Sequence, residues 1–240
     1  MASTINSTVA VAIVCKAPIA GQSKTRLSPP LQPDECAALS ACFIRDISNT
    51  IQSLAETDNV TGYAVYTPRG SEAVLRQLLP DRFRLMLQGE GDIGARMFES
   101  ISGLLAAGHA GAILIGADMP TMPISILRNA VQAVRGNDCL VLSPALDGGY
   151  TLIGLSQPHA GLFSDIPWST DQVYRLTLAR ALNLGLPVVN VSGWYDVDDA
   201  ASLRMLTDEL SGRRPPFADA SLVGADAPAT RAFLSARRNS

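Results

Sequence analysis

Aspartates follow apolar runs at three points of the sequence. Asp118 closes the run AILIGAD, Asp147 lies in SPALDGGYTLIGL, and Asp196 and Asp198 lie in GWYDVDD. A carboxylate beside a buried strand is costly unless a hydrogen bond, a cation or a metal compensates it. Asp118 therefore either caps the turn or helix that follows, with Thr121 as the alternative cap, or binds a divalent cation that also binds phosphates.

The pair Asp196 and Asp198 closes the last predicted strand. Strand alternation would place both side chains on one face, where mutual repulsion favours a shared cation. Together with Asp118 they predict an oxygen-rich Mg²⁺ or Mn²⁺ site, although Asp198 is also the expected N-cap of the next helix. Asp147 precedes two glycines, which is a hairpin signal; the alternative is a role as a base or an acceptor-binding group.

Basic residues follow the first apolar run, in KAPIAGQSKTRL. The Lys-Thr pair resembles the end of a P-loop, but Ser23 and Pro18 stand where that motif needs glycine. Lys16, Lys24 and Arg26 on this glycine-containing loop suit a diphosphate, and a solvated, charged turn is the alternative.

The stretch QGEGDIGARM contains a literal G-x-G-x-x-G at Gly89, Gly91 and Gly94. A dinucleotide fingerprint normally occupies the first strand–helix turn of its fold, whereas this one follows two earlier α/β units. Asp92 lies inside the motif and would repel a pyrophosphate. The context therefore argues against a NAD-type site.

The composition describes a well-filled core and argues against nucleic acid as a main partner. The 240 residues are 47% hydrophobic and 17% charged, with a net charge of −3 and no long basic stretch. The four cysteines show no C-x-x-C spacing and are expected to be free thiols. Neither a signal peptide nor a membrane span is expected, which predicts a cytoplasmic protein.

Alternating strand and helix patterns predict a three-layer α/β/α fold with a mainly parallel sheet. Ligands of such sheets lie outside the carboxyl ends of the strands. A single domain is expected over residues 1–210, followed by a C-terminal tail or short helix over 211–240. Strands are predicted at 9–15, 61–66, 82–87, 112–118, 139–143, 150–155 and 188–191, and helices at 34–54, 71–79, 94–107, 124–135, 170–184, after 198, and near 230–237. The helix at 170 is expected to begin with a capping box formed by Ser169 and Gln172.

Six motifs occur in the order found in a bacterial family of GT-A-fold transferases. They are KAPIAGQSKTRL, QGEGDIGARM, LIGADMP, SPALDGGYTLIGL, IPWST and WYDVDD. The sequence thus resembles, over roughly residues 9–208, the nucleotide-diphospho-sugar transferases or glycosyltransferases associated with arsenosugar biosynthesis or with radical-SAM and selenium genes. It is more distantly similar to 2-phospho-lactate and molybdenum-cofactor guanylyltransferases.

The resemblance implies a nucleotide bound by the first loop and by the loop from Gly89 to Arg96, and a metal at Asp118 helped by Asp196 or Asp198. Asp118-Met119-Pro120 lacks the second acid of the usual glycosyltransferase motif. The implied nucleotide-binding residues are Lys16, Ala17, Pro18, Gly21, Lys24, Arg26, Gln88, Gly91, Asp92 and Arg96. The implied acceptor-side residues are Gly148, Gly149, Trp168, Ser169 and Thr170.

The predicted function is a metal-dependent glycosyltransferase that uses a nucleotide-diphospho-sugar donor and a small-molecule acceptor. Lys24 and Arg26 would stabilise the leaving diphosphate and Asp147 would orient or deprotonate the acceptor. One alternative is a nucleotidyltransferase that joins an NTP to a phosphorylated acceptor and releases pyrophosphate. Another is a non-catalytic nucleotide-binding domain. The base, the sugar and the oligomeric state are left open, with a homodimer as one alternative.

Overall fold

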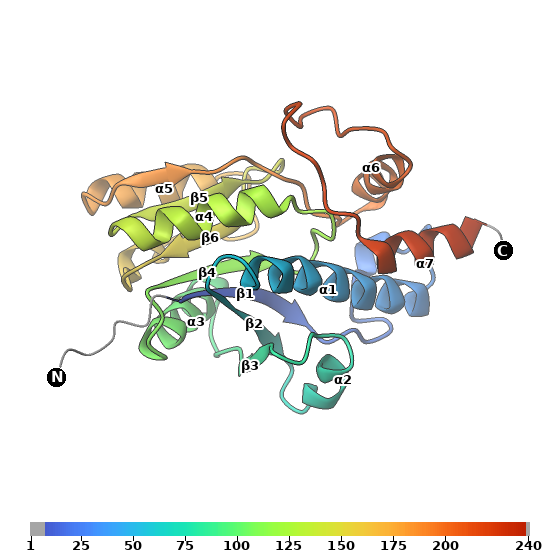
Figure 1. Ribbon diagram of the computed structural model, residues 1–240, viewed down its shortest axis with the longest axis horizontal. Coiled ribbons are helices and arrows are strands. Elements are labelled where there is room, and N and C mark those ends of the chain that lie inside the picture. Colours follow the sequence, from blue (N-terminus) through green and yellow to red (C-terminus); the bar gives the residue numbers. More distant parts are fainter. Residues whose placement is uncertain (1–7, 239–240) are drawn as a thin grey trace.

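The computed structural model describes residues 8–238, which form a seven-stranded sheet covered by helices on both faces (Figure 1). The strands are β1 (Val9–Lys16), β2 (Val60–Thr67), β3 (Arg84–Leu87), β4 (Gly111–Gly116), β5 (Leu140–Pro144), β6 (Tyr150–Leu155) and β7 (Val188–Asn190). The α-helices are α1 (Pro33–Ala55), α2 (Glu72–Arg76), α3 (Ile93–Ala106), α4 (Ile124–Gly136), α5 (Val173–Asn183), α6 (Ala200–Leu210) and α7 (Pro228–Arg238). Two short 3₁₀ helices, η1 (Thr25–Leu27) and η2 (Ala160–Leu162), lie in loops.

The sheet order is β3-β2-β1-β4-β6-β5-β7, and β6 alone runs antiparallel to its neighbours β4 and β5. The mainly parallel three-layer fold predicted from the sequence is confirmed. The Asp-Gly hairpin signal is also confirmed, because residues 145–149 join β5 to β6 as antiparallel neighbours. Reversal of β6 places its first residue, Tyr150, at the same edge as the carboxyl ends of the parallel strands.

Successive side chains of β1 alternate between two hydrophobic cores, one on each face of the sheet. Val9, Val11 and Ile13 pack with α1, α4, α6 and α7, whereas Ala10 and Ala12 pack with α3 and α5 on the opposite face. Alanines on the second face let the helices approach closely. Every strand of this central part is buried on both faces, which is why its sequence reads as a continuous apolar run.

Helix α1 begins where the local sequence dictates. Pro33 occupies the first helical position, and Gln32 and Glu35 form a capping box in which the Gln32 N–H donates to Glu35 Oε2 over 2.7 Å. By contrast, the predicted capping box at Ser169 is wrong. Helix α5 begins at Val173 and no side chain caps it.

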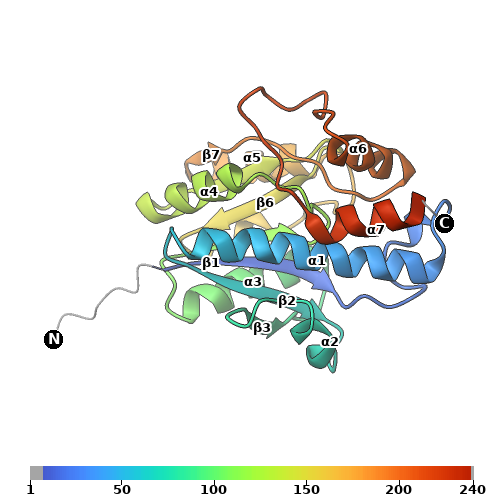
Figure 2. The ribbon, with the colours of Figure 1, turned by 45° about the vertical axis from the view of Figure 1, so that its right-hand side comes forward.

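The segment predicted as a tail contains α7, which packs along α1 (Figures 1 and 2). Leu234 of α7 is 7% exposed and belongs to the core shared with α1. Asp46 of α1 is 2% exposed and accepts hydrogen bonds from the backbone N–H groups of Ala229 and Thr230, over 3.0 and 2.8 Å. A buried carboxylate thus holds the first turn of α7, where the helix dipole favours negative charge.

Within residues 8–238, no helix combines the length and apolar character that crossing a membrane requires. The four cysteines are free, and three of them are buried.

Candidate active site

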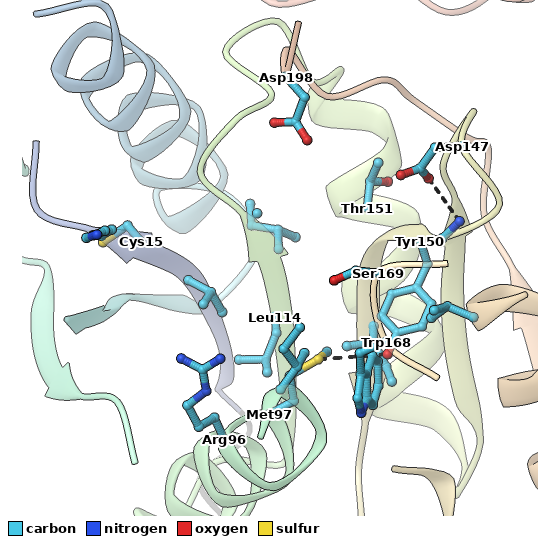
Figure 3. Close-up of a pocket in the computed structure, with 18 of the residues that line it drawn as sticks. Cys15, Arg96, Met97, Leu114, Asp147, Tyr150, Thr151, Trp168, Ser169 and Asp198 are labelled. Carbon is cyan, nitrogen blue, oxygen red and sulfur yellow. Dashed lines mark hydrogen bonds between the residues drawn. The ribbon is translucent and has the colours of Figure 1, made fainter. Parts of the chain in front are cut away.

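Two adjoining cavities lie at the carboxyl ends of the parallel strands. The larger, about 920 Å³, is bounded by β1, the start of α3, the β5–β6 hairpin and residues 168–173 (Figure 3). The smaller, about 230 Å³, lies between the first loop and Asp118. Lys16, Arg26 and Asp198 line both cavities, so the two form one continuous site. The larger volume is near the upper end of the range of about 300–1,000 Å³ that is typical of small-molecule sites.

Lys24 connects the loops around the smaller cavity. Its Nζ donates to Asp118 Oδ2 over 2.7 Å, to Asp198 Oδ1 over 2.8 Å and to the Val197 carbonyl over 2.8 Å. An ammonium group has three N–H donors, and these contacts use all three. The backbone of Lys24 is left-handed, with φ of 50°, a conformation that costs free energy in a non-glycine residue. The loop thus holds Lys24 in a strained state that directs the ammonium between two carboxylates.

Lys24, Asp118 and Asp198 form a junction in which the pKa values of Lys24 and Asp118 are shifted. Burial alone would lower the pKa of Lys24, but Asp118 and Asp198 outweigh it and raise that pKa. Burial raises the pKa of Asp118, an effect that the Lys24 ammonium reduces. Arg26 makes a second ion pair with Asp198 on the solvent side, where its side chain is 73% exposed.

Asp196 is not one of the carboxylates that Lys24 contacts. It lines neither cavity, and its pKa is raised to about 6, first by burial and then by the charges of Asp198 and Asp147. No three His, Cys, Asp or Glu residues are placed to hold a metal ion in the described part of the chain. Asp118 and Asp198 both contact Lys24 Nζ, whereas Asp196 does not, and the shared metal site of the three carboxylates stays a prediction. The predicted alternation fails because residues 191–198 are not a strand.

The capping predictions for these aspartates are also corrected. Asp199, not Asp198, caps α6, accepting hydrogen bonds from the N–H groups of Ala201 and Ser202. Neither Asp118 nor Thr121 caps α4, which begins after Pro123 without a side-chain cap.

Thr121 instead takes part in a buried network behind the junction. Its hydroxyl donates to Glu209 Oε2 over 2.8 Å, and Tyr195 donates to the same oxygen. Trp194 in turn donates from Nε1 to the Thr121 hydroxyl oxygen over 3.3 Å. Burial raises the pKa of Glu209. The network ties the loop after Asp118 to the segment that carries Asp196 and Asp198, so the two loops are braced against each other.

Some residues of the glycine loop before α3, and of α3 itself, line the larger cavity, and others only shape the loop. Asp92 is the N-cap of α3 and accepts from the Ala95 N–H over 2.8 Å, so its carboxylate is committed to the helix and does not line either cavity. Gln88 and Arg96 do line the larger cavity, and Arg96 Nη1 donates to Gln88 Oε1 over 3.4 Å. Gly91 has φ of 96° and shapes the turn without lining the cavity.

The predicted nucleotide-binding residues of the first loop also differ in whether they line the cavities. Lys16 and Arg26 face the cavities, whereas Ala17, Pro18 and Gly21 do not line them. The N–H of Ala17 donates to the Thr67 carbonyl over 2.8 Å, which fixes the chain as it leaves β1.

On the opposite side, Asp147 closes the hairpin by accepting from the Gly149 N–H over 2.9 Å. Asp147 and Gly149 line the larger cavity; Gly148 does not, because it packs against Asp171, whose carbonyl oxygen would lie 2.3 Å from an added Cβ. The other predicted acceptor-side residues, Trp168, Ser169 and Thr170, all line the cavity.

Sequence reasoning missed several lining residues, most of which belong to strands or helices. They are Thr67, Met97, Leu114, Tyr150, Asp171 and Val173. Most fit the apolar periodicity of their elements, which does not distinguish a core position from a cavity wall. Thr67 could have been found, because it ends a strand at the ligand-binding edge.

A family model described as an uncharacterized protein conserved in bacteria (DUF2064) matches residues 50–170, half of the chain. The protein belongs to this family. No curated protein matches the sequence.

Solved structures share the fold. A protein from Desulfovibrio desulfuricans G20, provisionally assigned to the nucleotide-diphospho-sugar transferases, aligns with a TM-score of 0.80 and 24% identity over 96% of this chain and 95% of its own. CMP:2-keto-3-deoxy-manno-octonic acid synthetase complexed with CTP aligns with a TM-score of 0.56 and 11% identity, over 86% and 99%. The 4-diphosphocytidyl-2C-methyl-D-erythritol synthase from Anaerococcus prevotii DSM 20548 gives 0.54 and 11%, over 86% and 97%. The GT-A-type fold predicted from the sequence is thereby confirmed.

Proposed function

We propose that this protein is a glycosyltransferase that moves a sugar from a nucleoside diphosphate to an acceptor hydroxyl. The observation that carries the proposal is the division of the site. A small cavity lined by Lys16, Lys24 and Arg26 opens into a larger one whose opposite wall carries Asp147. Cations suit the diphosphate of a donor, and a carboxylate suits an acceptor hydroxyl.

In this reaction the acceptor oxygen forms a bond to the anomeric carbon of the sugar. The bond between that carbon and the diphosphate oxygen breaks, and the nucleoside diphosphate leaves with the electron pair. Asp147 accepts the proton of the acceptor hydroxyl. Arg26 and Lys16 stabilise the negative charge that grows on the leaving group.

The donor set at Asp118 and Asp198 fits a hard divalent cation, since carboxylate oxygens are the ligands that Mg²⁺ and Mn²⁺ prefer. These two residues would hold such an ion, which supplies positive charge to the leaving diphosphate. In this structure Lys24 donates to both carboxylates. Its ammonium group would therefore move from the carboxylates to the phosphates when the ion and the donor bind. The Asp118–Lys24–Asp198 junction thus keeps the carboxylates compensated before the donor arrives.

Nucleotidyl transfer is the second candidate. It is favoured by the sequence Asp118-Met119-Pro120, which lacks a second acid two positions after the first. The same cationic cavity would then hold the triphosphate of an NTP, and a phosphorylated acceptor would attack the α-phosphate.

Differential scanning fluorimetry with Mn²⁺ and a panel of UDP-sugars, GDP-sugars, GTP and CTP separates these reactions. We expect a metal-dependent rise in melting temperature with one sugar nucleotide, and loss of that rise in Asp118→Ala. Asp147→Asn should keep the rise while losing turnover by about 10²–10⁴-fold, the range for a general base. A rise with an NTP and with no sugar nucleotide would replace glycosyl transfer by nucleotidyl transfer. Nucleotide binding that persists in Asp147→Asn, without turnover by the unaltered protein with any acceptor, would indicate a non-catalytic binding domain.

A further inference from the structure

Within the described residues, the larger cavity carries its cations on one side and carboxylates without cations on the opposite wall. Its cations, Lys16, Arg26 and Arg96, come from the end of β1, from η1 and from α3, and the lining carboxylate beside them, Asp198, is paired with Arg26. The wall formed by the β5–β6 hairpin and the segment before α5 carries Asp147 and Asp171 instead, with no lysine or arginine among its described lining residues. An anionic group placed against that wall would meet carboxylates and no compensating cation.

The same wall continues into an apolar surface. Met97, Leu114, Tyr150 and Trp168 converge below Asp147 in the cavity (Figure 3). Tyr150 donates a weak hydrogen bond to Met97 Sδ over 3.9 Å, which links β6 to α3. These side chains offer ring faces and a polarizable sulfur, a combination that favours contact with a flat apolar partner.

Trp168 is held in a fixed position at this surface. A Cβ on Gly94 would lie 2.9 Å from Trp168 Nε1 and 2.6 Å from the Phe163 carbonyl oxygen, so the indole rests directly on the first turn of α3. Because Gly94 leaves room for the ring, Trp168 packs against the core on one side and lines the cavity as a preorganised aromatic surface on the other. Preorganised aromatic surfaces bind ligands at a low entropic cost.

We infer that the acceptor is an uncharged hydroxyl compound with an apolar ring face, which packs against Trp168 and Tyr150 while its hydroxyl reaches Asp147. The inference rests on the proposed glycosyltransferase function and narrows its acceptor class. It excludes a phosphorylated acceptor, which the carboxylate wall would repel. Arg26 and the other cations remain available for the donor.

Calorimetric titration of the full chain with three probes tests the acceptor class. They are p-nitrophenyl β-D-glucoside, which is neutral and carries a ring; p-nitrophenyl phosphate, which has the same ring and a phosphate; and glucose, which lacks the ring. We expect the glucoside to bind roughly 2- to 12-fold more tightly than glucose, the range for a ring contact of this kind, and more tightly than the phosphate, which the carboxylates repel. Phosphate binding equal to or tighter than glucoside binding would overturn the inference.

Substitutions at Trp168 and Asp171 test the wall itself. Trp168→Ala should weaken glucoside binding about tenfold, Trp168→Phe should retain most of it, and Leu182→Ala, at an exposed leucine of α5, should leave it unchanged. Asp171→Lys should tighten binding of p-nitrophenyl phosphate severalfold by placing a cation on the wall. Equal glucoside affinity of Trp168→Ala and the unaltered protein, with both folded by circular dichroism, would refute a role for the ring.

Donor binding is measured separately, with Mn²⁺ and the sugar-nucleotide panel in the same calorimeter. Trp168→Ala should bind the donor as the unaltered protein does, because the cationic loops are intact. If a donor binds but the phosphate probe is preferred, the acceptor class is wrong while the transferase proposal stands. If the glucoside binds through Trp168 but no sugar nucleotide binds, the ring-binding wall is supported and the glycosyltransferase proposal fails.

Discussion

Replacement of Lys24 by methionine isolates the charge of the residue that joins the two aspartate loops. Methionine keeps an unbranched side chain but leaves Asp118 and Asp198 without the ammonium. Lys24 is 8% exposed, whereas the two carboxylates are 38% and 32% exposed. Removing one partner of a fully buried pair costs about 3–5 kcal/mol, and an exposed pair contributes at most about 1 kcal/mol.

The partial exposure of the carboxylates places Lys24→Met between these limits. We expect the free energy of unfolding to fall by about 1–3 kcal/mol in metal-free buffer. For a chain of this size, that corresponds to a melting temperature lower by roughly 3–10 °C. Mn²⁺ should restore more stability to Lys24→Met than it adds to the unaltered protein, because no ammonium then competes for the carboxylates.

Urea unfolding followed by circular dichroism, with EDTA and then with Mn²⁺, measures both effects. Arg26→Met is the matched control: it removes a cation from the same Asp198, but its side chain is 73% exposed, so its cost should stay within about 1 kcal/mol. If Lys24→Met unfolds at the same urea concentration as Arg26→Met in EDTA, the junction does not hold the loops together. If Mn²⁺ stabilises the variant no more than the unaltered protein, Lys24 does not compete with a metal.

Three further predictions concern packing, the C-terminal helix and pH. Gly94→Ala should lower the free energy of unfolding by about 1–3 kcal/mol, because the added methyl overpacks against Trp168. Gly136→Ala, where nothing lies within 4 Å of the added methyl, should leave the free energy of unfolding unchanged or raise it. Thermal unfolding of both variants compares them directly. Asp46→Asn should cost about 1–2 kcal/mol and expose α7 to limited proteolysis, and unchanged protease resistance would show that α7 is held otherwise. Burial lowers the pKa of His109 below the value of about 6.5 expected in the unfolded chain. As the pH falls, the unfolded chain therefore binds a proton before the folded protein does, and the free energy of unfolding should decrease from pH 7 to 5. Urea midpoints measured across that range should fall less steeply in His109→Gln.

Most strands and helices of the fold can be predicted from local sequence patterns. Continuous apolar runs such as that of β1 predict strands buried on both faces, and helical spacing predicts α1 and α4 to within a few residues. The Asp147-Gly148 pair predicts the hairpin that reverses β6. Helix starts were less predictable, because Gln172 and Asp199 rather than Ser169 and Asp198 occupy the N-caps, and neighbouring polar residues compete for each such position.

Tertiary structure decided which of the polar residues meet. The sequence supplied Lys24, Asp118 and Asp198 as candidates for diphosphate and metal, but Lys24 and Asp198 are 174 positions apart, and only the packed sheet brings the ammonium between the carboxylates. Likewise, only the packing of residues 163–168 on α3 turns Gly94 into the support for Trp168. Residue types and local periodicity limit what chemistry the chain can do. The contacts that select one chemistry join distant segments, and their geometry is fixed only when the core that holds those segments is complete.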